Sequence, residues 1–202
     1  MENRYSKINI RALLDPGGPA SIGEENLSAL LEKFSCSQNP DVEYFLKHNA
    51  VEFTKKSLSV THLVFEENTM LAGFFTITVK PLFVRTANIS KTMGKKLAQV
   101  SVFDISTQSY LTAAYMIAQL GKNYSIPKEK QVPGYILLGM ALQNVALLKY
   151  DAGGILEFLE CEDNKFLLQF YQENQFKVFD KRVEASKRSS NPRVLHQLLK
   201  FV

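Results

Sequence analysis

The sequence of 202 residues is poor in the residues that build metal sites and disulfide frameworks. Its two cysteines, Cys36 and Cys161, lie far apart, with no CxxC pair and no histidine nearby, so neither a zinc site nor a disulfide framework is indicated. The three histidines, His48, His62 and His196, are isolated, without a second ligand at i+4 or the spacing of a nucleophile and its base. We therefore expect core or surface thiols, no metal site and no catalytic triad.

Long hydrophobic runs and a strong net charge are also missing. No apolar run approaches the roughly 20 residues that a membrane-crossing helix needs, and the polar stretch 1–10 is unlike a signal peptide. With 46% hydrophobic and 22% charged residues, the chain falls in the globular range and is long enough for one good core. The net charge of +4 does not by itself indicate a nucleic-acid ligand. We expect one soluble, cytoplasmic domain that does not contact a membrane.

Strand and helix patterns alternate along the chain. Residues 1–23 are predicted to form an N-terminal strand (5–14) and a Gly- and Pro-rich linker, and residues 24–202 the core. Within the core, the hydrophobic spacing predicts helices at 24–34, from Pro40 onward, at 89–100 and at 134–150, a hairpin at 60–65 and 71–79, and strands at 112–120 and 155–161. The stretch 177–200 is rich in Lys and Arg, which fits a solvated hairpin as well as a site for an acidic partner.

The helix at 134–150 connects two predicted strands and so completes a βαβ unit. By the handedness rule such a unit is a right-handed crossover between parallel strands. The loop at 121–133 then leads into the N-terminus of the helix, where unpaired N–H groups and the positive end of the helix dipole can hold a pyrophosphate. Ligand binding is therefore expected at this junction.

Five motifs in this order resemble those of the GNAT acetyltransferase superfamily. They are Phe34-Ser-Cys36 before an acidic helix, Gly73-Phe74-Phe75-Thr76-Ile77, Met116-Ile117-Ala118-Gln119-Leu120, Gly134-Tyr135-Ile136-Leu137-Leu138, and Glu160-Cys161-Glu162-Asp163-Asn164, followed by Phe170-Tyr171 and Phe176. The resemblance is closest to the subgroup that includes small bacterial acetyltransferases and the toxins that acetylate aminoacyl-tRNA. It implies an α+β (mixed α/β) GNAT fold, in which helices flank a central, mostly antiparallel mixed sheet with one parallel βαβ pair.

The resemblance also implies acetyl-CoA as co-substrate, no metal, and direct attack of a neutral amine on the thioester. The cofactor-binding residues that it implies are Gln119, Leu120, Gly121, Lys130, Gln131, Val132, Gly134, Tyr135 and Asn164. The family's phosphate-binding motif is altered in this chain, and it can be aligned in two registers. In one register Gln131 and Gly134 match the motif. In the other only Gly134 matches, and Val132 stands where the family has a small residue. Asn164 is also interpreted as the start of the last helix.

Tyr171 occupies the position where many relatives place the acid that protonates the departing thiolate. A phenol with a pKa of about 10 can donate a proton at neutral pH. The alternative is a packed aromatic residue, because Tyr171 follows Phe170 and lies four residues after Leu167. No general base is identified, since Glu160 and Glu162 fit a solvated face or a cap equally well.

Family relatives place Gly before the final Phe, where this chain has Gln175, and Asn174 is expected to take the left-handed conformation instead.

Three functions remain open. The first is acetylation of a primary amine on a small molecule, peptide or protein, and the second is toxin-like acetylation of aminoacyl-tRNA. The third is a non-catalytic GNAT-like binding module. The sequence does not choose the acceptor, and it leaves a homodimer and an antitoxin partner open.

Overall fold

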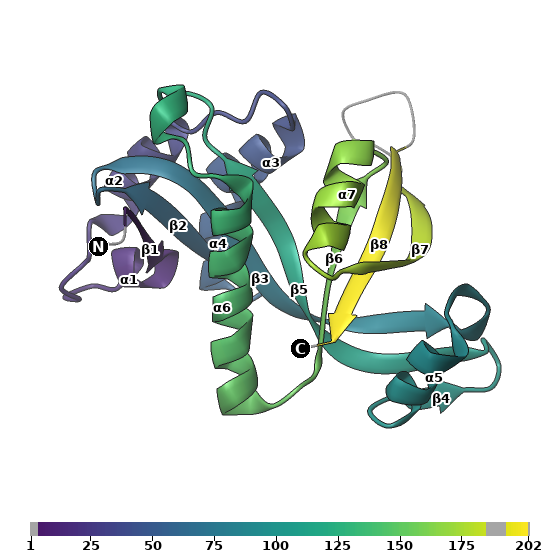
Figure 1. Ribbon diagram of the computed structural model, residues 1–202. Coiled ribbons are helices and arrows are strands. Elements are labelled where there is room, and N and C mark those ends of the chain that lie inside the picture. The colour runs from purple at the N-terminus through teal and green to yellow at the C-terminus, as the bar shows by residue number, and fades with distance from the viewer. Residues whose placement is uncertain (1–3, 185–192, 202) are drawn as a thin grey trace. The chain divides into compact units, whose positions relative to one another are not determined.

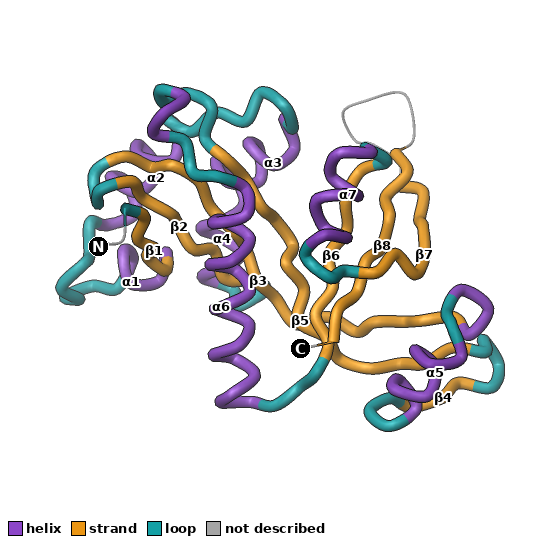
Figure 2. The backbone as a smooth tube through the Cα atoms, in the orientation of Figure 1, coloured by secondary structure: helices purple, strands orange, loops and turns teal. Residues whose placement is uncertain are grey.

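The computed structural model describes residues 4–184 and 193–201, which form two compact units. The first unit comprises Met1–Thr78 and Ile117–Leu148, and the second comprises Val79–Met116 and Lys149–Val202. Two long strands, β3 (Met70–Arg85) and β5 (Ser109–Lys122), run through both units (Figure 2). The prediction that the whole chain is a single domain stays a prediction.

One mixed sheet contains the eight described strands. Its order is β1-β2-β3-β5-β6-β8-β7, with β4 paired to β5. Besides β3 and β5, the strands are β1 (Tyr5–Asn9), β2 (Val60–Glu66), β4 (Val102–Asp104), β6 (Leu156–Glu162), β7 (Lys177–Glu184) and β8 (Arg193–Phe201). The predicted hairpin of β2 and β3 is confirmed, with Leu63 opposite Phe74 and His62 opposite Phe75. Strands β5 and β6 are neighbours in the sheet, as the predicted βαβ unit requires.

In the first unit, helices cover both faces of β1, β2 and β3 (Figure 1). One face packs on α1 (Ile10–Leu14), α2 (Gly23–Glu32), α3 (Pro40–Tyr44), the π-helical turn η1 (Phe45–Asn49) and α4 (Ala50–Lys55). Leu63 and Phe74 belong to the core on this side. On the other face, Asn144 of α6 (Gly134–Ala152) contacts His62 and Lys7. Alternate residues of the strands therefore face helices on opposite sides of the sheet.

The N-terminal strand is shorter than the sequence predicts. The strand ends at Asn9, and the rest of the predicted segment 5–14 is the helix α1. The Asn9 side-chain oxygen accepts a hydrogen bond from the Arg11 amide at 2.9 Å, which caps the helix. Ile10 and Leu13 are buried beneath it. The strand prediction is wrong after Asn9 because a single turn of helix is too short to show its period in the sequence.

The second unit holds α5 (Lys91–Ala98), the 3₁₀ turn η2 (Thr86–Asn88) and α7 (Lys165–Glu173). The predicted helix at 89–100 is confirmed, but the short strand β4 that follows it was not predicted. The core of this unit contains Leu82, Val84, Leu97, Leu156, Phe158 and Leu199, among others. Strands β7 and β8 form the predicted charge-rich hairpin, although Lys187 and Arg188 lie outside the described residues.

Helix α6 meets, by length and composition alone, the criteria for a membrane-crossing helix. An 18-residue window within Lys128–Ala152 has a mean hydropathy of 1.3, so the sequence-based statement that no segment is apolar enough needs correction. The core helix of a soluble protein meets the same criteria, and α6 has Leu137, Leu138, Ala141 and Val145 buried along one stripe. This finding is therefore weak evidence for a membrane span.

Candidate active site

The end of β5 passes very close to β3, and two glycines permit this approach. A Cβ on Gly121 would lie 2.4 Å from Phe74 Cε1 and 2.7 Å from Val42 Cγ1. A Cβ on Gly73 would lie 2.8 Å from the Gly121 carbonyl oxygen. The sequence predicts that Gly121 binds the cofactor. Close packing alone already requires a glycine at this position. Its neighbours Gln119 and Leu120 are half-buried on the same strand.

A buried asparagine that the sequence analysis missed anchors the loop after β5. The Asn123 side-chain oxygen accepts hydrogen bonds from the Ser35 and Ser125 amides, both at 3.0 Å. Its amide nitrogen donates to the Leu71 carbonyl at 2.7 Å. Because the Ser35 and Leu71 backbone groups are distant in sequence, no local pattern could have shown that this residue joins the loop to them.

The side chains of Gln131 and Val132 face the inside of the loop at 121–133. The Gln131 side-chain nitrogen donates to the Ile126 carbonyl at 3.1 Å, and the Gln131 backbone carbonyl accepts from the Tyr5 hydroxyl, also at 3.1 Å. Val132 is fully buried, so its side chain points away from solvent. Both side chains therefore stabilise the loop itself. Lys130, at the end of the 3₁₀ turn η3 (Lys128–Lys130), is half-buried.

The N-terminus of α6 follows this loop and is open to solvent. Gly134 is exposed, Tyr135 is 66% exposed, and the first turn carries no acidic residue. The Ile136 and Leu137 amides donate to the Pro133 carbonyl, each at 3.1 Å. Since the first N–H groups of a helix have no acceptor within it, those of Gly134 and Tyr135 are available to an anionic ligand.

In the second unit, Tyr171 is buried on α7. Its ring packs edge-on against Phe170 and Phe176, with centroids 5.2 Å and 6.1 Å away. Burial, with a smaller contribution from the Cys161 thiol, raises the pKa of Tyr171 well above its usual value. The phenol therefore keeps its proton throughout the physiological range. Tyr171 is thus a packed aromatic residue with a protonated hydroxyl, and its catalytic role stays a prediction.

Asn164 is the N-cap of α7, as the sequence predicts. Its side-chain oxygen accepts from the Phe166 and Leu167 amides at 2.9 Å and 3.3 Å. The expectation for the other end of α7 is wrong. Gln175, with a φ of 72°, takes the left-handed conformation, while Asn174 has a φ of −88° and donates its side-chain amide to the Phe170 carbonyl. That hydrogen bond holds Asn174 at the helix end, so the residue in the left-handed conformation is Gln175 instead of Asn174.

The two acidic candidates for a general base are both engaged by arginines. Arg182 donates to the two carboxylate oxygens of Glu160 at 2.8 Å and 2.6 Å, and Gln197 donates to the same carboxylate at 2.7 Å. Arg193 lies 3.3 Å from Glu162. Both carboxylate oxygens of Glu160 are therefore occupied by hydrogen bonds within the protein. The geometry therefore gives no support to Glu160 as a base.

Two histidines that look isolated in the sequence have partners in the structure. His196 Nε2 lies 2.9 Å from Asp163, a contact between β8 and the end of β6. His62 stacks on Phe75 and lies 3.2 Å from the Asn144 amide, and burial, followed by the charge of Lys7, lowers its pKa to about 4. His62 is therefore neutral at physiological pH. Among the described residues, no three His, Cys, Asp or Glu side chains gather as a metal site would require.

Comparison with known proteins identifies the fold. No protein-family model and no curated protein matches the sequence. The structure resembles AtaT complexed with acetyl-methionyl-tRNAfMet, with a TM-score of 0.56 and 14% identity over 81% of this chain and 85% of the other. It also resembles AtaTR bound with acetyl-CoA, with a TM-score of 0.54 and 12% identity over 96% and 93% of the two chains. A tyrosine-to-phenylalanine variant of KacT gives a TM-score of 0.60 and 16% identity over 96% and 95%. At these identities the likeness establishes the fold, so the predicted mixed α+β GNAT fold is confirmed.

Proposed function

We propose that this protein is an acetyl-CoA-dependent N-acetyltransferase that moves the acetyl group to a primary amine of a small molecule, peptide or protein. The observation that carries the proposal is the open N-terminus of α6 at the end of β5, in a fold shared with AtaTR bound with acetyl-CoA. A cytoplasmic location, expected from the sequence, belongs to the same proposal.

The residues at the start of α6 fit a pyrophosphate. The positive end of a 19-residue helix, two available N–H groups and the absence of acids in the first turn all favour an anion. Lys128 and Lys130 add positive charge one turn earlier. Val132, which falls on a position of small residues in one register of the family motif, is buried and so leaves the approach to the backbone open. Gly134 is the motif residue that both registers share.

The reaction needs an acetyl donor, a neutral amine and a proton for the departing thiolate. Acetyl-CoA supplies the activated acetyl group and the thiol leaving group. We assign the proton donor to Tyr171 from the resemblance, and its phenol is protonated at neutral pH, as a proton donor must be. Tyr171→Phe keeps the packed ring and removes only the hydroxyl. We expect it to lower kcat by about 10²-fold or more while acetyl-CoA binding is unchanged.

Calorimetric titration with acetyl-CoA tests the proposal. Gly134→Glu places a carboxylate where the pyrophosphate would lie and should abolish binding. Gly139→Glu is the matched control, because it adds the same charge to the same helix at a position where a Cβ meets nothing within 4 Å. Binding lost in the first variant and kept in the second supports the proposal. Absence of binding by the wild-type protein would overturn the proposal and favour a non-catalytic binding module. The hydrogen bond of the Gln131 side chain within the loop supports that alternative.

Acetylation of aminoacyl-tRNA is the second candidate, and two observations favour it. One of the similar structures is AtaT complexed with acetyl-methionyl-tRNAfMet. The stretch 79–116 also carries Lys80, Arg85, Lys91, Lys95 and Lys96 against the single acid Asp104, a net +4 that equals the charge of the whole chain. Transfer of radiolabelled acetyl groups to charged tRNA, with uncharged tRNA and simple amines as comparisons, decides between the two acceptor classes.

A further inference from the structure

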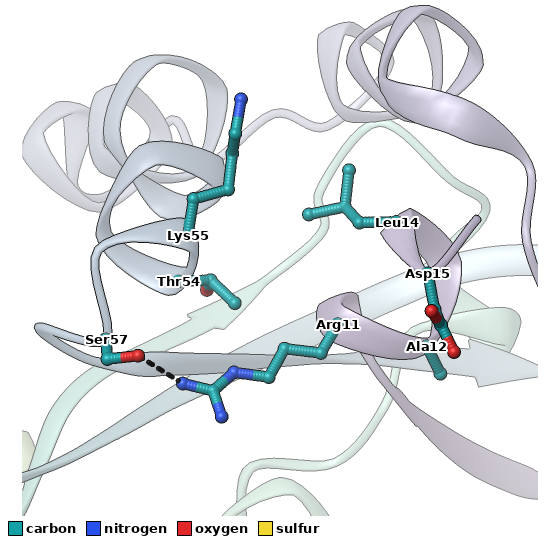
Figure 3. A pocket seen from close by; sticks show the side chains of 7 residues that line it. All are labelled: Arg11, Ala12, Leu14, Asp15, Thr54, Lys55 and Ser57. Atoms are coloured by element: carbon teal, nitrogen blue, oxygen red, sulfur yellow. Dashed lines mark hydrogen bonds between the residues drawn. The ribbon is translucent and has the colours of Figure 1, made fainter.

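The first unit holds a pocket of about 420 Å³ between α1 and α4 (Figure 3). Its two cations already have partners, because Arg11 donates to the Ser57 hydroxyl at 3.0 Å and Lys55 forms an ion pair with Glu24 at 2.9 Å. In Figure 3 the two cationic side chains extend in different directions. This pocket therefore offers no concentrated positive charge to a ligand.

Positive charge is concentrated in the second unit instead. A pocket of about 640 Å³ in this unit is lined by Lys80, Arg85 and Lys181 beside Phe83. Lys80 and Arg85 belong to the stretch 79–116, which forms the far half of β3, the turn η2, α5, β4 and the start of β5. We call this stretch the basic arm. Its cations are all exposed, and they are Lys80, Arg85, Lys91, Lys95 and Lys96.

The basic arm leaves its positive charge uncompensated. Among the described residues, none of its five cations has a carboxylate within ion-pair distance. The single acid in its sequence is Asp104. The Asp104 carboxylate accepts hydrogen bonds from the Ser106 amide at 2.9 Å and the Thr107 hydroxyl at 2.8 Å, so it stabilises the turn after β4. The net charge of +4 on the arm is therefore available to an anionic partner.

The hairpin of β4 and β5 exposes apolar side chains at its tip. Val102 on β4 is 71% exposed, and Ile105, in the turn that Asp104 stabilises, is 77% exposed. Phe103 follows Val102 on the strand and so points to the opposite face of the hairpin, where its ring centroid lies 5.2 Å from that of Tyr110. Apolar groups therefore project from both faces of the hairpin and from its turn.

The end of β3 brings a cation next to this tip. The Thr86 amide and hydroxyl both donate to the Gln108 carbonyl, at 3.0 Å and 3.2 Å. Gln108 is the last residue before β5 resumes, in the same turn as Ile105. Arg85, the residue before Thr86, therefore lies beside that turn.

The helix α5 brings two more cations to the hairpin. A Cβ on its Gly94 would lie 3.7 Å from the Tyr110 hydroxyl, so the helix packs on the hairpin. Lys91 and Lys95 are four residues apart, which places them on the same face of the helix, and both are exposed. The tip is thus an apolar surface bordered by positive charge.

This combination favours a membrane surface with anionic lipids over the other partners of a cationic surface. A nucleic acid would pair with the cations, but Val102 and Ile105 have no ring on which a base could stack. A protein partner packs closely against one face, whereas these apolar groups project from both faces of the hairpin and from its turn. Lipid headgroups surround a tip that enters them, and anionic lipids attract the cations at its border.

We propose that the basic arm binds the surface of a membrane that contains anionic lipids. Val102 and Ile105 enter the region of the headgroups, and Arg85, Lys91 and Lys95 contact lipid phosphates. This contact lies on the membrane surface and is compatible with the proposed cytoplasmic location. It departs from the expectation, drawn from the sequence, that the chain does not contact a membrane. Membrane binding is independent of the proposed acetyltransferase activity and is measured without acetyl-CoA.

Sedimentation of the protein with lipid vesicles tests the proposal. We expect binding to vesicles of phosphatidylcholine and phosphatidylserine that weakens as the salt concentration rises, and little binding to vesicles of phosphatidylcholine alone. Ile105→Asp places a charge at the tip and should weaken binding at least about tenfold. Lys91→Gln and Lys95→Gln should each weaken it about fivefold.

Matched controls come from the same unit, outside the basic arm. Val183→Asp adds the same charge at another β-branched residue, which is 69% exposed on β7. Lys165→Gln removes an exposed lysine at the start of α7. Both variants should bind the mixed vesicles as the wild type does. Because all the substituted positions are exposed, none of the variants should lose its fold.

The proposal fails if the mixed vesicles do not sediment the protein at low salt, or if Ile105→Asp and Val183→Asp lose equal affinity. It also fails if the protein binds single-stranded RNA but no vesicles, or if Ile105→Asp separates a dimer and leaves vesicle binding unchanged. Acetyl-CoA calorimetry on the same variants distinguishes this surface from the proposed function. Vesicle binding without acetyl-CoA binding would refute the enzyme and leave the membrane surface, and the reverse result would refute the membrane surface alone.

Discussion

Replacing Glu157 by glutamine should make the protein less sensitive to rising pH. Glu157 lies on β6 and is 0% exposed, and neither carboxylate oxygen has a hydrogen-bond partner in the described residues. Burial raises the pKa of this carboxyl from 4.5 to about 7, although the charges of Lys200 and then Lys149 oppose the rise. Lys200 Nζ is 3.9 Å from Oε1, too far for a hydrogen bond.

The sign of the effect follows from comparing the two states. Below about pH 4.5 the carboxyl is protonated in both the folded and the unfolded chain, so it contributes no pH dependence. Between about pH 4.5 and 7 the unfolded chain loses the proton while the folded protein keeps it, and the free energy of unfolding falls. Above about pH 7 the loss is complete, and the difference between 4.5 and about 7 corresponds to about 3 kcal/mol.

Urea unfolding from about pH 4 to pH 8 measures this loss. We expect the difference in the free energy of unfolding, Glu157→Gln minus wild type, to increase by about 3 kcal/mol over that range, whatever its value at low pH. Glu173→Gln, which removes an exposed carboxylate of the same unit, should show a difference that is nearly independent of pH. Lys200→Met should move the wild-type transition to higher pH, because it removes the nearer cation. A constant difference for Glu157→Gln across the whole range would refute the reasoning.

The remaining predictions concern backbone conformation, capping and packing, and equilibrium unfolding of the purified variants checks each of them. Gln175→Gly should raise the free energy of unfolding by about 1 kcal/mol, because Gln175 holds a φ of 72° that costs glycine nothing; a loss of stability would show that its side chain matters. Asn164→Ala should lower it by about 1 kcal/mol by removing the cap of α7, and Asn164→Asp should restore most of the loss. Gly121→Ala should lower it by about 1–3 kcal/mol, since the new Cβ would overlap Phe74, whereas Gly139→Ala, with open space around its Cβ, should be neutral or stabilising.

The sequence predicted the elements whose period repeats over several turns or residue pairs. The helix from Gly134, the β2–β3 hairpin and the helix at 89–100 are all present. The sequence also predicted a feature that one residue makes with its immediate neighbours, the helix cap formed by Asn164. The sequence did not show the single turn α1 or the three-residue strand β4, because neither is long enough to display a period.

Contacts between residues distant in the sequence came only from the tertiary structure. It showed that Glu160 is held by Arg182, that His196 lies against Asp163, and that Gly121 is a glycine because Phe74 leaves no room for a Cβ. It also gathered Lys80, Arg85 and Lys181, separated by up to a hundred residues, beside Phe83 at one pocket. The physical reason is the same in each case. Periodicity and capping depend on neighbours a few residues apart, whereas ion pairing, desolvation and close packing depend on whichever strands the sheet brings together.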